Sequence, residues 1–392
     1  MAAVALVAVS LSVQANTRSV NESKNALGPS DPRWIAAWGA TPEITQIAPA
    51  NSSVRNIARI SVTGTEVRVR VANPRSGSTP LVIGSASIAL QQGQLGADVV
   101  PGSITVLTFD GNPGVTIPTS TDALYSDPVP FAVEANQNVA VTLSLPAASN
   151  PDVGGAQWNS SYITPANGGD QTRRESGAGF STSIETTYAL TAIDVLTTHA
   201  NGAIVALGSS TMHGFNSTRD GYDRVLDLYI TRNETEVADG NRKGIVAAAV
   251  GGDTLFAAKD RLERDVLSQS GVTAVILWAT NDLATRTAAQ IITDYQTVIR
   301  RSHDAGIRVY CPTWAPRTQT NDARAERSIL NEWIANSGQC DDTVDWDRTL
   351  RSNTAASTLK LEFYSDGTHA NAAGHAAMSA ATPLRWFTGE PR

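Results

Sequence analysis

The sequence AIVALGSSTMHG at residues 203–214 decides the fold of the second half of the chain. It is an apolar run that stops at Gly208 and is followed by Ser209, Ser210 and a short polar segment. An apolar run of this length that ends at a glycine is typical of a buried strand in a parallel sheet. If one serine is a nucleophile held at the end of that strand, the protein is a hydrolase. If neither is, the stretch is an ordinary turn between a strand and a helix.

Apolar runs of the same kind recur further along the chain. They are GIVAAAV (244–250), AVILWAT (274–280), IRVYC (307–311) and TVDW (343–346). Apolar residues at helical spacing lie between them, as in 220–230 and 287–306. Strand and helix in alternation predict a doubly wound, flavodoxin-like α/β domain with a parallel sheet over residues 198–392. In such folds ligands bind beyond the carboxyl ends of the strands.

The first half of the chain has a different period. From residue 34 to 197 short strands with alternating apolar and polar residues follow one another without helical stretches. In RISVTGTEVRVRVAN, residues 59–73, the alternation on both sides of Gly64 predicts a hairpin with one buried face. The pattern predicts an all-β domain over 34–197, an antiparallel sandwich of jelly-roll type, with a barrel as the alternative.

Composition and the N-terminus narrow the class of protein. The chain has 392 residues, 41% of them hydrophobic, and a net charge of −7 without a long basic run, so we expect a globular protein that does not bind nucleic acid. The first dozen residues are apolar but too few to cross a bilayer, and they end in a small-x-small sequence at Ala15. We therefore predict a signal peptide at 1–15, a polar segment at 16–33 and a secreted protein with no membrane partner. An apolar N-terminus or a pro-segment is the alternative.

Four strand-end segments together supply what acyl transfer needs. They are GSSTMHG (208–214), VGGDTL (250–255), ATNDLA (279–284) and YSDGTHANAAGH (364–375). A serine is a poor nucleophile without a base, and Asp366 lies three residues before His369, close enough to orient that imidazole. A developing oxyanion needs donors fixed in advance, which a glycine N–H after the second strand and the Asn281 side chain would provide.

These blocks resemble the SGNH hydrolases, also called the GDSL esterase/lipase family, over about residues 200–385. The resemblance implies a nucleophile at Ser210 and oxyanion donors at Ser210, Gly252 and Asn281. It also implies a general base at His369 with Asp366 as the carboxylate that orients it. The first half of the chain is similar to the β-rich domain that precedes the catalytic domain in a two-domain branch of this family.

The chain departs from the family pattern at three positions. Ser209 stands where the family has aspartate, and Ala279 stands where the third block begins with glycine. His213 replaces a frequent aspartate. We expect Ser209 to loosen the turn at the nucleophile and Ala279 to narrow the acyl pocket. We expect His213 to alter the local charge.

The resemblance implies a secreted serine esterase that needs no metal and no cofactor. Its expected substrates are small, acetyl-type esters of a small molecule or a glycan. A lipase or lysophospholipase is the enzymatic alternative. A glycan-binding protein with an inactive hydrolase domain is the alternative from another class: Ser209 and Ala279 favour it, whereas the presence of Ser210, Asn281 and His369 argues against it.

The two cysteines, Cys311 and Cys340, are predicted to stay unpaired. Cys311 lies near the carboxyl end of the predicted fourth strand. A helical stretch at 322–338 then returns the chain to the opposite end of the sheet, and Cys340 lies a few residues before the next strand. In adjacent parallel strands the two cysteines would then be separated along the strand direction by about four residues, at roughly 3.3 Å per residue. A disulfide needs Cα atoms about 4.4–6.8 Å apart. The alternative is the single disulfide common in secreted proteins.

Overall fold

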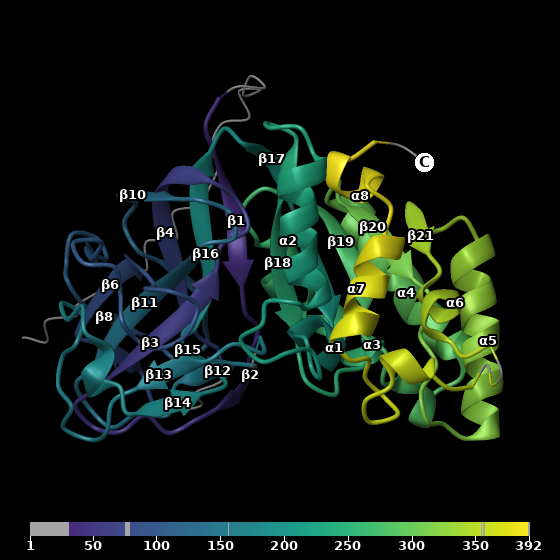
Figure 1. Cartoon of the computed structure of the whole chain (residues 1–392), viewed down its shortest axis with the longest axis horizontal. Helices are drawn as coiled ribbons and strands as arrows, with labels where there is room; N and C mark the ends of the chain where they lie inside the picture. The colour runs from purple at the N-terminus through teal and green to yellow at the C-terminus, as the bar shows by residue number, and fades with distance from the viewer. Residues whose placement is uncertain (1–30, 75–78, 156, 354, 356, 391–392) are drawn as a thin grey trace, which may run out of the picture.

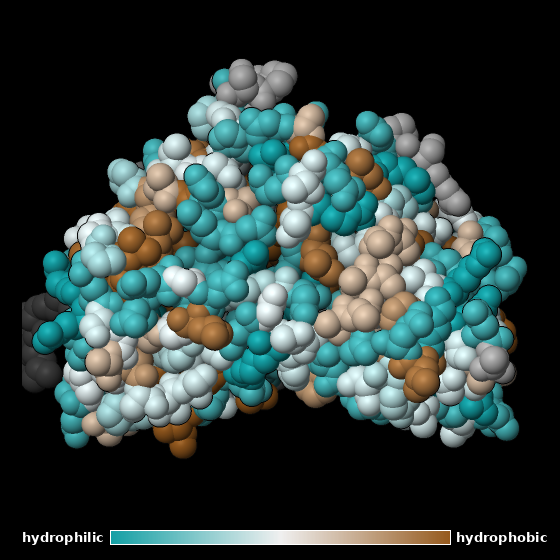
Figure 2. All heavy atoms as spheres, viewed as in Figure 1, coloured by the Kyte–Doolittle hydropathy of each residue, from teal (hydrophilic) through white to brown (hydrophobic). Residues whose placement is uncertain are grey.

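The computed structural model describes residues 31–74, 79–155, 157–353, 355 and 357–390. An antiparallel β-rich region and an α/β region lie side by side (Figure 1). The predicted signal peptide and residues 16–30 of the polar segment fall outside the described residues. No helix of the described part is long and apolar enough to cross a bilayer. On the face shown in Figure 2, apolar residues are scattered among hydrophilic ones.

The β-rich region consists of small antiparallel sheets. One has the order β1-β16-β4-β10, with β9 also on β4, and another the order β14-β13-β3-β11-β6-β7; β15-β12-β2 and β5-β8 are smaller. The strands are β1 (Arg33–Gly39), β2 (Pro42–Thr45), β3 (Ser52–Arg59), β4 (Gly64–Asn73), β5 (Leu81–Ile83), β6 (Ser85–Leu90), β7 (Thr105–Leu107), β8 (Val115–Ile117), β9 (Thr121–Tyr125), β10 (Val129–Val133), β11 (Asn138–Leu145), β12 (Asp152–Gly154), β13 (Ser161–Ile163), β14 (Thr182–Ile184), β15 (Thr187–Tyr188) and β16 (Leu190–Thr197).

The hairpin predicted around Gly64 is wrong. β3 and β4 belong to different sheets, and β4 pairs with β16, β10 and β9. The connecting residues cross from one sheet to the other, and the Ser61 N–H donates to the Ala37 carbonyl at 3.0 Å on the way. Alternation in a sequence shows which face of a strand is buried, but it does not name the strand's partner.

The α/β region has the predicted parallel sheet. Its order is β18-β17-β19-β20-β21, and all of its strand pairs are parallel. The strands are β17 (Ala200–Gly208), β18 (Arg242–Ala249), β19 (Val272–Trp278), β20 (Arg308–Pro312) and β21 (Asp342–Val344). This is the flavodoxin-like strand order. The second strand, β18, is added on one side of β17 and all later strands are added on the other side, so the order reverses between β17 and β19. Such a reversal is where ligands bind in doubly wound sheets.

Helices connect and cover these strands. In Figure 1, α2 and α7 lie in front of the sheet, while α4 packs against β20 and α5. The α-helices are α1 (Ser210–His213), α2 (Val225–Glu236), α3 (Leu255–Ala258), α4 (Ala288–Asp304), α5 (Asn321–Asn336), α6 (Trp346–Leu350), α7 (Ala372–Ala381) and α8 (Arg385–Thr388). The helical turns that are not α-helical are η1 (Gly177–Gly179), η2 (Lys259–Arg261), η3 (Glu263–Leu267), η4 (Asp282–Ala284) and η5 (Leu361–Phe363); η3 is a π-helix and the others are 3-10 helices.

The two regions share one hydrophobic core, and their backbones are in direct contact. β1 passes so close to β18 that a Cβ atom on Gly244 would lie 2.1 Å from the Ala36 carbonyl oxygen, so this position needs glycine. The Ala36 N–H donates to the Ser270 carbonyl at 2.9 Å, and the Ile245 N–H donates to Ser61 Oγ at 2.9 Å. These direct backbone contacts fix the position of the β-rich region against the parallel sheet, and with it the position of side chains on β2, the strand that follows β1.

The prediction of unpaired cysteines is also wrong. Cys311 and Cys340 form a disulfide, with their Cα atoms 6.1 Å apart. The prediction assumed that the chain runs extended from Cys340 into β21. Instead it bends at Cys340 and Asp341, and the Asp341 N–H bonds the Val309 carbonyl at 2.9 Å. This bend brings the Cys340 Cα atom within disulfide range of Cys311, although the strand register pairs Cys311 with Thr343.

Candidate active site

Ser209 and Ser210 have different environments at the end of β17. Ser209 is extended, with φ −118°, and is 1% exposed. Ser210 begins α1 and is partly exposed. The turn needs the preceding glycine, because a Cβ atom on Gly208 would lie 2.3 Å from Met212 Cγ. Of the two serines, Ser210 is the one within reach of a ligand.

A chain of hydrogen bonds joins Ser210, His369 and Asp366. Ser210 Oγ lies 2.8 Å from His369 Nε2, and His369 Nδ1 lies 2.8 Å from Asp366 Oδ2. An ionised carboxylate only accepts hydrogen bonds, so Nδ1 carries the ring proton. Nε2 is then left as the acceptor for the serine hydroxyl.

The Asp366 carboxylate is held in its charged form. Partial burial opposes ionisation, but hydrogen bonds outweigh it: Oδ1 accepts from the N–H groups of His369 at 2.8 Å and Thr368 at 2.9 Å, and Oδ2 faces the His369 ring. Together these contacts keep the pKa of Asp366 well below its usual range. The imidazole therefore has a permanent negative partner.

The ends of three neighbouring strands lie level at this edge of the sheet. Gly208 of β17 is paired with Ala249 of β18 and with Trp278 of β19. Ser210, Gly252 and Asn281 each follow these positions by two or three residues. The structure thus brings the three predicted positions to one edge of the sheet, at the point where the strand order reverses.

Gly252 presents an unused backbone donor. It lies in a turn closed by the Asp253 N–H and the Val250 carbonyl, 3.2 Å apart, and its φ of +72° favours glycine. The turn adjoins the nucleophile strand, since the Val250 N–H bonds the Gly208 carbonyl at 3.1 Å. Within the part of the chain that the structure describes, the Gly252 N–H has no hydrogen-bond partner.

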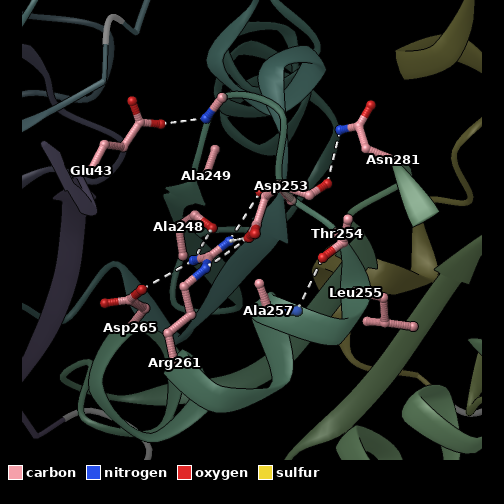
Figure 3. Close-up of polar contacts among 12 residues, drawn as sticks. Glu43, Ala248, Ala249, Asp253, Thr254, Leu255, Ala257, Arg261, Asp265 and Asn281 are labelled. Carbon is pink, nitrogen blue, oxygen red and sulfur yellow. Dashed lines mark hydrogen bonds and ion pairs between the residues drawn. The ribbon is translucent and has the colours of Figure 1, made fainter. Parts of the chain in front are cut away.

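The orientation of the Asn281 amide is set by Arg317, which the sequence motifs did not identify. Arg317 Nη1 donates to Asn281 Oδ1 at 2.7 Å. Because a guanidinium has no acceptor, the amide oxygen must face it. Asn281 Nδ2 then donates one hydrogen to the Asp253 carbonyl at 2.8 Å and keeps a second hydrogen free (Figure 3). Burial lowers the pKa of Arg317 to about 10, so it remains charged at neutral pH.

A cavity of about 620 Å³ opens next to these groups. Its lining is mainly of hydroxyl, amide and small side chains, with one guanidinium: Thr280, Asn281, Leu283, Ala284, Arg317, Thr318, Gln319, Thr320, Ala323 and Thr368. Thr368 precedes His369, which places the cavity beside the hydrogen-bonded chain. Among the described residues, no three or more His, Cys, Asp or Glu side chains are grouped so as to hold a metal ion.

Aromatic rings border the other side of the histidine. The ring of Phe215 lies 4.6 Å from that of His369 and 4.7 Å from that of Trp158, measured between centroids. Trp158 belongs to the β-rich region, and its Nε1 donates to the Ser217 carbonyl at 2.7 Å. The β-rich region therefore packs against Phe215, the ring that contacts His369.

Of the three departures from the family pattern, Ser209 directly precedes Ser210, and all three residues are buried. Ala279 is 1% exposed and is not among the residues that line the cavity. His213 is buried, and its Nε2 bonds the Ala249 carbonyl at 2.8 Å. Loss of hydration lowers the pKa of His213 to about 4, and the position is uncharged at neutral pH.

Two buried histidines should make stability fall in mild acid. Burial lowers the pKa of both His213 and His375 to about 4, whereas an unfolded histidine titrates near about 6.5. Between these values the unfolded state binds more protons, so stability decreases as pH falls from about 6.5 towards 4. We expect a loss of about 2 kcal/mol per histidine between pH 7 and pH 5. Urea unfolding at both pH values checks this; equal free energies of unfolding would contradict it.

Part of the chain matches a known protein family. Residues 206–377 match the model of the GDSL-like lipase/acylhydrolase family. Three solved structures that resemble the chain are a GDSL-like lipase from Bacteroides thetaiotaomicron (17% identity, 46% of this chain and 85% of that chain, TM-score 0.38), an acetyl xylan esterase (19%, 46% and 100%, 0.36) and a psychrotrophic esterase from a Pseudoalteromonas species (15%, 46% and 96%, 0.37). No curated protein matches the chain.

Proposed function

We propose a serine-esterase mechanism for this protein, whose residues 206–377 form a domain of the GDSL-like lipase/acylhydrolase family and which is therefore a carboxylic ester hydrolase. The observation that carries the mechanism is the hydrogen-bonded chain from Ser210 through His369 to Asp366. The three groups have the order nucleophile, base and orienting carboxylate that acyl transfer requires.

In the first step His369 Nε2 accepts the Ser210 proton while Oγ bonds to the ester carbonyl carbon. The imidazolium then gives this proton to the departing alcohol as the ester C–O bond breaks and an acyl-serine forms. In the second half of the reaction water attacks the acyl-serine, His369 takes the water proton and returns it to Ser210, and the acid leaves. Asp366 keeps Nδ1 protonated and stabilises the transient positive charge.

The carbonyl oxygen becomes negative in both steps and needs donors that are already in place. We assign this role to the N–H groups of Ser210 and Gly252 and to Asn281 Nδ2. The free donor on Gly252 and the second hydrogen of Asn281 Nδ2 support the assignment. The contact with Arg317 further polarises the Asn281 amide, since it withdraws electrons from Oδ1.

The proposed substrate is a carbohydrate that carries small acyl esters, and we propose that the enzyme acts on it outside the cell. The hydroxyl and amide groups of the cavity lining suit an oxygen-rich ligand better than a long alkyl chain, and Leu283 is the one large aliphatic residue among the lining residues. The exposed face of Phe215 beside His369 offers a sugar ring an apolar surface. The Cys311–Cys340 disulfide and the predicted signal peptide support an extracellular setting.

A chain-length series tests this proposal. p-Nitrophenyl esters from acetate to octanoate, together with acetylated xylo-oligosaccharides, are incubated with the full-length chain. We expect kcat/KM to fall at least about tenfold from acetate to octanoate, and acetate to be released from the oligosaccharides. A preference for octanoate would support the lipase alternative. Binding of the oligosaccharides without turnover of any ester would support the glycan-binding alternative.

A further inference from the structure

Glu43 reaches from the β-rich region into the turn that carries Gly252. It lies in β2, and its Oε1 accepts a hydrogen bond from the Gly251 N–H (Figure 3). The side chain is only 16% exposed, and Oε1 lies 3.3 Å from Nε2 of the uncharged His213. The contact joins residues 208 positions apart, so no local sequence pattern indicates it.

The rest of this turn is held from within the α/β region. Arg261 Nη2 bonds the Asp253 carboxylate at 2.7 Å, and Asn281 Nδ2 bonds the Asp253 carbonyl at 2.8 Å (Figure 3). Arg261 also donates to the Gly208 carbonyl at 3.1 Å and thereby ties the turn to the end of β17. These contacts hold the second half of the turn, and Glu43 holds the first.

We infer that Glu43 is a positioning residue through which the β-rich region completes the oxyanion site; the inference rests on the proposed donor role of Gly252. Two consecutive glycines give this turn the greatest conformational freedom that a chain can have. Glu43 removes much of that freedom, because its carboxylate fixes the peptide N–H directly before the Gly252 donor. A donor that must be oriented during the reaction stabilises an oxyanion less than one fixed beforehand.

The surroundings of Glu43 confine its carboxylate to this place. A Cβ atom on Gly155 would lie 2.5 Å from Glu43 Oε2 and 2.4 Å from His213 Cε1, so β-rich backbone and imidazole close around the carboxylate. His213 is in turn fixed by its bond to the Ala249 carbonyl at 2.8 Å. The carboxylate therefore has little room to leave the Gly251 N–H.

Glu43→Ala and Glu43→Gln, compared with Glu134→Ala, test the inference. Glu134 is an exposed carboxylate of the same β-rich region. With p-nitrophenyl acetate as substrate, we expect Glu43→Ala to lower kcat by about 10- to 100-fold and to leave KM within about twofold of the wild type. This is the effect expected when the Gly252 N–H donor is displaced slightly from the oxyanion. Glu43→Gln keeps a carbonyl acceptor and should stay within about threefold of the wild type. Glu134→Ala should match the wild type.

Thermal melting of each variant separates positioning from simple stabilisation. Equal losses of kcat in Glu43→Gln and Glu43→Ala, or a loss that follows the fraction of unfolded protein, would overturn the inference. An unchanged kcat in Glu43→Ala would also overturn the inference about Glu43. The proposed function would not be affected by that result, because it depends on ester turnover by the wild type. If Glu43→Ala does not fold, Glu43→Asp replaces it, because its shorter side chain keeps the charge but draws the carboxylate away from the Gly251 N–H and should lower kcat by a similar factor. An unchanged kcat in Glu43→Asp would overturn the inference.

Discussion

Ser210→Ala and His369→Ala are each expected to lower kcat for p-nitrophenyl acetate by at least about 10⁴-fold, with KM little changed. Ser210 Oγ and His369 Nε2 share one hydrogen bond of 2.8 Å, so removal of either group stops the same proton transfer. The double variant should therefore be about as slow as either single variant. Steady-state kinetics of the three variants measures this.

Ser209→Ala is the matched control, because it removes a hydroxyl one residue away. Ser209 is 1% exposed and cannot reach a substrate, so its substitution should leave kcat within about tenfold of the wild type. If Ser209→Ala abolishes turnover while Ser210→Ala remains active, the nucleophile is misassigned. Multiplicative losses in the Ser210/His369 double variant would show that the two residues do not act as a unit.

Asn281→Ala is expected to lower kcat by about 10²–10³-fold, the usual result of removing one oxyanion donor. The variant also loses the contacts with Arg317 and with the Asp253 carbonyl, so kcat is compared at a temperature where thermal melting shows both proteins folded. Asn336→Ala serves as a control, since this exposed asparagine lies on α5 and its side chain donates to Glu332. An increase in KM with kcat unchanged would show that Asn281 binds the substrate equally in its ground and transition states, which contradicts an oxyanion role.

The parallel sheet and the core of the candidate site could be predicted from the sequence because both depend on local patterns. Strands buried on both faces must be continuous apolar runs, and the runs that end at Gly208, Ala249 and Trp278 are such strands. Asp366 and His369 meet because three residues and one turn suffice to bring a carboxylate to the next imidazole.

The tertiary structure alone decided which distant groups meet. Period-two alternation showed that β3 and β4 have buried faces, but their partners in separate sheets depend on how the whole β-rich region packs. The disulfide depends on a bend at Cys340 that has no signature in composition or period. The contacts of Glu43 with Gly251 and of Arg317 with Asn281 join residues far apart in the chain. Such contacts are formed by packing, and a sequence records the hydrophobicity of each position rather than the neighbour that it will meet.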